Sequence, residues 1–94
     1  MRKYEAMIVL DTKGNEQSGE QIANTIGNEF TKAGAKLTQI DRLGLKKFPH
    51  SPRHVEHGYY VNIYFEAEPA TVSALEAKLK LNTDVYQQVY LRTE

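Results

Sequence analysis

Residues 57–65 read His-Gly-Tyr-Tyr-Val-Asn-Ile-Tyr-Phe, an aromatic and β-branched run with a glycine near its start. Side chains of these types favour a strand, so the run predicts a strand at the centre of a sheet. A short basic connection with two prolines, residues 46–54, comes shortly before it and brings cations and imidazoles to one end of that sheet. This combination indicates a binding surface more than a reaction centre.

The composition limits the chain to one small domain, residues 1–94, with 40% hydrophobic residues and no cysteine. Without cysteine the chain has no disulfide, thiolate nucleophile or zinc–thiolate site. Its 12 basic and 12 acidic residues cancel, so any contact with nucleic acid has to be local. The first residues contain no apolar run long enough for a signal peptide or membrane span, so we expect a soluble, cytoplasmic protein.

Apolar periodicity divides the chain into six elements. Ile22, Ile26 and Phe30 recur at helical spacing, Gly34 is placed to end that helix, and Pro69 suits the first turn of a second helix. Within residues 36–48 the apolar residues change phase, which indicates a bulge or twist in an edge strand. The predicted elements are strand 4–10, helix 17–33, strand 36–48, strand 59–67, a helix from 69 to the turn at 82–84, and strand 85–92.

The order β-α-β-β-α-β predicts an α+β, ferredoxin-like domain with both helices on one face of a four-stranded antiparallel sheet. The first and third strands are expected at the centre, the second and fourth at the edges, and the other sheet face is expected to be open. In the last strand, Val89 and Leu91 are predicted to face the core, with Tyr90 and Arg92 on the opposite side.

Three tyrosines are predicted on the open face, namely Tyr60, Tyr64 and Tyr90, with Asn62 and Met7 between them. A tyrosine offers apolar area with a polar tip, so these residues are candidates for binding a partner, either by stacking nucleobases or by receiving another protein. The alternative is that they complete a half-exposed sheet.

Three histidines in the proline-containing connection, His50, His54 and His57, are candidates for chemistry. Their spacing, with Glu56 as the only acidic neighbour, matches a metal site poorly. The adjacent Ser51 lacks an orienting third group and an oxyanion hole. We therefore predict no enzyme, no cofactor and no metal. The alternative is a ferredoxin-like small-molecule-binding or enzymatic domain that uses these histidines.

Basic residues cluster at or near the predicted strand ends, where they are candidates for neutralising RNA phosphates. Each one alone is equally well explained as solvated charge, and only their placement around an open sheet favours a role as a group. The predicted RNA-binding residues are Arg2, Lys3, Lys46, Lys47, Arg53 and Arg92.

Five segments, 1–5, 8–10, 34–36, 43–47 and 58–60, together resemble the bacterial small-subunit ribosomal protein six family in order and spacing. The resemblance covers nearly the whole chain. It implies a structural ribosomal protein that is a monomer when free and binds small-subunit ribosomal RNA together with small-subunit ribosomal protein eighteen. By position, Arg2 corresponds to the N-terminal basic residue of the family, and Lys46 and Lys47 correspond to its basic pair after Gly44-Leu45.

The chain departs from the family pattern in its basic pair and in the loop that follows. Lysines replace the arginines commonly found in the pair, so bidentate phosphate contacts become point-charge contacts. Residues 48–52, Phe-Pro-His-Ser-Pro, stand where the family usually has a Leu-Ala-Tyr-Pro-Ile-like stretch. The sequence ends at Glu94 without the acidic tail of some members, so we expect no tail-dependent interactions.

Overall fold

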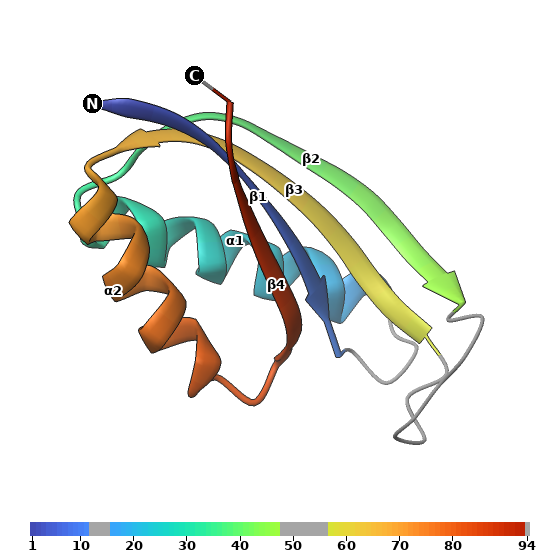
Figure 1. Ribbon diagram of the computed structural model, residues 1–94. Helices are drawn as coiled ribbons and strands as arrows, with labels where there is room; N and C mark the ends of the chain where they lie inside the picture. Colours follow the sequence, from blue (N-terminus) through green and yellow to red (C-terminus); the bar gives the residue numbers. More distant parts are fainter. Residues whose placement is uncertain (12–15, 48–56, 94) are drawn as a thin grey trace.

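The protein folds into one antiparallel sheet with two helices packed against a single face (Figure 1). The computed structural model describes residues 1–11, 16–47 and 57–93. The elements are β1 (Arg2–Leu10), α1 (Glu16–Lys32), β2 (Lys36–Lys47), β3 (His57–Ala67), α2 (Pro69–Lys80) and β4 (Val85–Arg92). The strand order is β2-β3-β1-β4, which confirms the ferredoxin-like prediction with β1 and β3 at the centre.

The two ends of the sheet carry different segments of the chain. Both chain termini lie at one end, whereas β2 finishes and β3 begins at the other (Figure 1). Tyr59 of β3 pairs with Leu10 of β1 and with Leu45 of β2, so the register is continuous across the three strands. This register places each side chain of β1 and β3 on a definite face.

Helix α1 approaches the sheet closely because a glycine lies at the contact. A Cβ atom on Gly19 would lie 2.3 to 2.8 Å from ring atoms of Tyr59, closer than non-bonded atoms come. Just after the end of the helix at Lys32 comes Gly34, whose φ of 101° is a left-handed conformation that favours glycine. The Ala35 amide donates to the Phe30 carbonyl at 3.0 Å and the Gly34 amide to that of Thr31 at 3.1 Å, which is a Schellman cap.

Aromatic rings occupy the centre of the core between the sheet and the helices. Phe65 stacks on Tyr4 with ring centroids 5.6 Å apart and meets Phe30 edge-on at 4.9 Å. Leu75 and Leu79 of α2 are also fully buried. The alternating pattern of β1 and β3 therefore predicted their core-facing residues correctly.

Strand β2 carries the irregularity that its changing apolar phase predicts. Its pairing with β3 shifts between Leu37 and Gln39 and again between Arg42 and Gly44. These bulges leave Leu43 exposed while Ile40 still packs against the core. Bulges and charged residues at a sheet edge discourage pairing with a further strand.

The prediction for β4 is wrong, because its side chains lie on the opposite faces from those expected. Tyr90 pairs with Ala6 and packs against the core, whereas Val89 and Leu91 are 40% and 48% exposed on the open face. The small Ala6 side chain leaves room on the core face, and the Tyr90 ring fills it, meeting Phe65 edge-on at 6.5 Å. Arg92, opposite Tyr4, shares the helix-covered face.

Candidate nucleic-acid and partner interface

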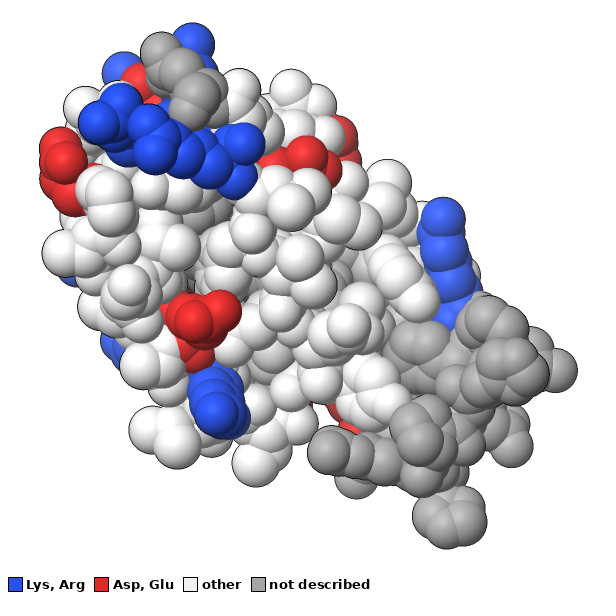
Figure 2. Space-filling view, in the orientation of Figure 1, with Lys and Arg blue, Asp and Glu red and all other residues white. Residues whose placement is uncertain are grey.

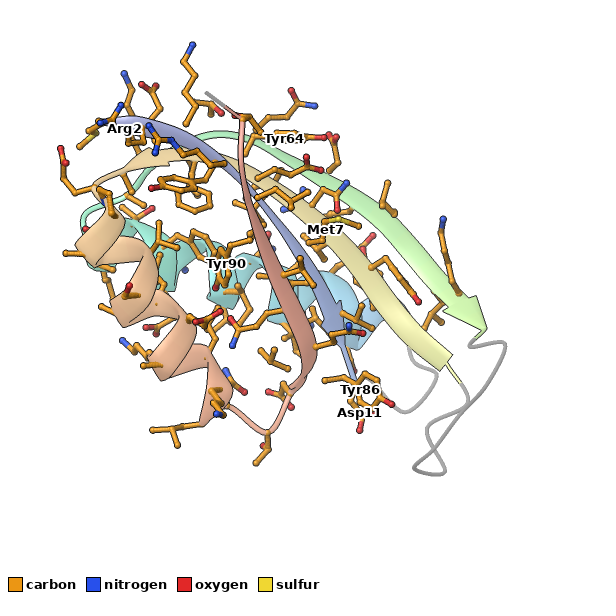
Figure 3. The ribbon with its side chains drawn as sticks, in the orientation of Figure 1. Arg2, Met7, Asp11, Tyr64, Tyr86 and Tyr90 are labelled. Carbon is orange, nitrogen blue, oxygen red and sulfur yellow. The ribbon has the colours of Figure 1, made fainter. Side chains whose placement is uncertain are left out.

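The first basic group lies at the end of the sheet where the termini meet. Arg2, Lys3 and Arg92 are all exposed there. Arg92 pairs with Tyr4, two residues from Arg2 on the same face, and the Thr93 amide donates to the Lys3 carbonyl at 2.9 Å. Figure 2 shows lysine and arginine side chains gathered at this end, and Figure 3 places Arg2 among them.

The open-face part of this end carries mixed charge. Lys3 of β1 and Lys36 of β2 both pair with Glu66 of β3, so an acidic residue lies between two basic residues in the strand register. The two arginines of the group, Arg2 and Arg92, lie instead on the helix-covered side of the sheet.

The second basic group lies at the opposite end, where β2 finishes. Lys46 is exposed, pairs with Gly58, and holds its ammonium nitrogen 5.8 Å from the centroid of the Tyr60 ring. Lys47 is the last residue of β2, and the predicted contact residue Arg53 lies outside the described residues. From Gly58 to Glu66, β3 advances eight residues, roughly 26 Å at about 3.3 Å each.

The predicted basic residues that the structure describes thus form two separate groups, as expected from the strand order. Figure 2 shows a largely uncharged surface between them. Such a spacing suits contacts with well-separated phosphates of one folded RNA rather than with a single phosphate group.

The open face between the basic groups presents aromatic and apolar side chains. Tyr60 and Tyr64 are half-buried there, as predicted, and Met7 is 42% exposed near the middle of the sheet (Figure 3). Val89 and Leu91 extend this surface onto β4, although the sequence pattern assigned them to the core. Monomeric proteins seldom expose adjoining apolar side chains without a use for them.

Tyr90 is not part of the open face, so its predicted placement there is wrong. Its ring lies on the helix side of β4 (Figure 3), and its hydroxyl donates to Gln88 Oε1 at 2.7 Å. Gln88 in turn donates to the Glu76 carbonyl at 3.0 Å, which joins β4 to α2. Burial, and secondarily the negative charge of Glu76, raises the pKa of the Tyr90 hydroxyl above its usual range.

The proposed chemistry of the histidine loop falls mostly outside the described part of the chain. His50 and His54 lie outside the described residues, and His57 is described only as the first residue of β3. Among residues 1–11, 16–47 and 57–93, no group of three potential metal ligands comes together. No helix in those ranges is long and apolar enough to cross a membrane.

The strand order β2-β3-β1-β4 and the two helices on one face define a ferredoxin-like α+β domain. The sequence matches the family described as "Ribosomal protein S6" over residues 3–92, and the chain belongs to this family. It is 33% identical to small ribosomal subunit protein bS6 of Akkermansia muciniphila over 90 residues, covering 96% of each chain. It is 34% identical to the bS6 protein of Mycolicibacterium paratuberculosis over 94 residues, covering 100% of this chain and 98% of the other.

Solved structures show the same fold. The crystal structure of 30S ribosomal protein S6 from Thermotoga maritima superposes with a TM-score of 0.85 at 21% identity, covering 97% of this chain and 86% of that one. Membership in the family makes the chain a protein of the small ribosomal subunit, so its location is the cytoplasmic ribosome, as predicted. The family consists of structural ribosomal proteins, which agrees with the prediction of a non-enzymatic role.

Proposed function

We propose that this protein is a non-enzymatic assembly component that binds small-subunit ribosomal RNA together with small-subunit ribosomal protein eighteen. The observation that carries the proposal is the pair of basic groups at opposite ends of one sheet, with an open face of mostly uncharged side chains between them. Family membership supports the ribosomal setting. No cofactor or metal takes part.

The proposed RNA contacts are electrostatic and act through phosphates. Lysine and arginine side chains release condensed counterions when they neutralise phosphates, so affinity falls as salt rises. Exposed to solvent are Arg2, Lys3, Lys46 and Arg92. The proposed contact residues are Arg2, Lys3, Lys46, Lys47, Arg53 and Arg92.

The proposed contact residues for a partner, either an RNA base or protein eighteen, are Tyr60 and Tyr64 on the open face. The free protein is a monomer, and protein eighteen joins it to form one RNA-facing surface. When protein eighteen binds to the RNA-bound form of this protein, it stabilises that form by mass action. RNA binding is therefore tighter when protein eighteen is present.

The direct test is binding to a fragment from the central domain of small-subunit ribosomal RNA across a salt series, with and without protein eighteen. We expect salt-sensitive binding that strengthens when protein eighteen is added. Affinity independent of salt would contradict phosphate contact, and affinity unchanged by protein eighteen would contradict joint assembly.

Matched variants separate the basic groups from overall charge. Combined Lys46→Ala and Lys47→Ala should reduce the log–log salt slope by roughly 0.7 to 0.9 for each phosphate that the variant no longer neutralises. Lys32→Ala with Lys80→Ala removes the same charge from the two helices and should leave the slope nearly unchanged. Replacing His50, His54 and His57 together should have only a modest effect at neutral pH, which distinguishes the RNA-binding role from the histidine-based alternative.

A further inference from the structure

A small hollow lies on the open face beside Tyr60, on the side away from Lys46. Its volume is about 120 Å³, and its lining combines apolar and amide side chains. The lining side chains are Met7, Val9, Tyr60, Asn62, Gln87 and Val89. One water needs roughly 10 to 15 Å³ of such a cavity, so the hollow has room for a group much larger than a single water.

The strand register explains the shape of this hollow. Tyr60 on β3 pairs with Val9 on β1, and Val9 pairs with Gln87 on β4, so the three form one row across the sheet. Val9 is buried and forms the floor, while Tyr60 and Gln87 rise on either side. Strands β3 and β4 are separated by two inter-strand spacings, roughly 9 to 10 Å. A planar ring that needs roughly 3.4 Å to each wall, the spacing of stacked bases, fits between them.

The Tyr60 ring has a different neighbour on each face. The Lys46 ammonium lies over it from the β2 side at 5.8 Å from the ring centroid. Gly44 and Gly58, on the floor beside Tyr60 and Lys46, have no side chains to cover them. A base stacked on Tyr60 from the β1 side would therefore lie across the ring from the Lys46 ammonium.

Two amides supply hydrogen-bonding groups at the walls. Asn62 on β3 and Gln87 on β4 make no side-chain hydrogen bonds within the part of the chain that the structure describes. An Asn or Gln amide offers a donor and an acceptor side by side, which matches the paired donor and acceptor of an adenine edge. A purely apolar side chain from a protein would leave both amides without partners in the contact.

We propose that this hollow, which we call the Tyr60 pocket, binds one unpaired adenine base of the ribosomal RNA, stacked on Tyr60 and held by Asn62 or Gln87. The proposal rests on the proposed RNA-binding function and assigns Tyr60 an RNA partner rather than a protein one. Unpaired bases are the usual targets of sequence-specific RNA recognition, because their edges and faces are accessible.

The test uses the full-length, ¹⁵N-labelled protein titrated with hexa-adenylate and hexa-uridylate at one low salt concentration. We expect hexa-adenylate to bind at least about fivefold more tightly, the lower bound for one good amide–base pair. The side-chain amide signals of Asn62 and Gln87 should shift with hexa-adenylate. Tyr60→Ala should weaken hexa-adenylate binding by about tenfold, whereas Tyr60→Phe should retain it, since stacking needs only the ring.

Two further variants complete the test. Leu91→Ala truncates an exposed side chain on the same face outside the pocket and should leave the preference for adenine unchanged. Gln87→Leu should reduce the preference without weakening hexa-uridylate. Equal affinity for the two oligonucleotides, with Tyr60→Ala no more harmful than Leu91→Ala, would overturn the proposal.

The remaining outcomes separate this proposal from the proposed function. If the RNA fragment binds with the expected salt dependence but Tyr60→Ala weakens only the binding of protein eighteen, the pocket receives a protein side chain and the adenine proposal fails alone. If neither the oligonucleotides nor the RNA fragment binds, with or without protein eighteen, both proposals fail.

Discussion

The helix-covered face and the open face of this sheet carry similar side chains in different environments. Tyr59 and Tyr60 are consecutive residues of β3, yet Tyr59 is 1% exposed under Gly19 while Tyr60 is half-buried beside a hollow. Because successive side chains of a strand point to opposite faces, strand parity alone separates them. Tyr59 is part of the core, whereas Tyr60 is the residue proposed to contact a partner.

This difference shows that residue type alone does not assign function on such a sheet. On the covered face, close packing makes each ring sensitive to any change in volume. On the open face, the Tyr60 ring is only half-buried, so its removal should cost less stability than removal of the buried Tyr59 ring. Substitutions at neighbouring positions should therefore separate stability from binding.

The largest contrast is expected between Phe65→Ala and Tyr64→Ala. Phe65 contacts Tyr4, Phe30 and Tyr90 at the centre of the core, so its removal leaves a cavity. We expect Phe65→Ala to lower the free energy of unfolding by about 3 to 5 kcal/mol. Tyr64→Ala should change it by less than about 1 kcal/mol. Urea denaturation measures both, and equal decreases would break the distinction between the faces.

A second contrast compares two glycines of α1. At Gly19 a methyl group would overlap the buried Tyr59 ring, so Gly19→Ala should destabilise the protein by about 1 to 3 kcal/mol. At Gly27 the nearest atom is the Ile40 methyl at 3.2 Å, which can move. Gly27→Ala should be neutral or stabilise by up to about 1 kcal/mol through helix propensity. Thermal unfolding of the two variants tests this, and a stabilising Gly19→Ala would disprove the close approach.

A third prediction sharpens the assignment of Tyr90 to the covered face. Tyr90→Phe removes the hydrogen bond to Gln88 and should cost about 1 kcal/mol at neutral pH. The raised pKa of Tyr90 means that the folded state holds its proton where the unfolded state releases it. Wild-type stability should therefore fall as the pH rises above about 10, the ordinary tyrosine value.

The measurement is urea denaturation between pH 9 and 11 for the wild type and Tyr90→Phe. The variant should show the smaller decrease in stability across that range. Tyr64→Phe, on the open face, serves as the matched control. If Tyr64→Phe reduced the alkaline decrease as much as Tyr90→Phe, the burial of Tyr90 would not be its cause.

The smallest expected effect concerns the layer of helices that covers the sheet. An ion pair between Glu29 of α1 and Lys78 of α2 joins the two helices. The hydrogen bond from Lys78 lowers the pKa of Glu29 below its usual value. The stabilisation of the fold by this ion pair is therefore present above pH 4.5, the usual value, and is lost as the pH falls. Glu29→Gln should lower the melting temperature slightly at neutral pH and less in acid. Glu20→Gln, an exposed change on the same helix, is the control.

Local patterns predicted the element order, the ferredoxin-like fold and the faces of β1 and β3. Their apolar alternation repeats over many residues, and a helix with Ile22, Ile26 and Phe30 in one stripe has only one face to bury. The same local information placed Arg2, Lys3 and Arg92 at one end of the sheet and Lys46 with Lys47 at the other. Their roles in RNA binding remain predictions.

The sequence by itself therefore determined the fold, the family and which residues are basic and near strand ends. Only the tertiary structure decided the face of each β4 residue, because that depends on pairing with β1 and on the shift between Val9 and Leu10. Only packing showed that Tyr90 fits above Ala6, that Gly19 makes room for Tyr59, and that the Tyr60 pocket exists. Alternation within one strand is a local property, whereas register and cavities arise from contacts between residues far apart in the chain.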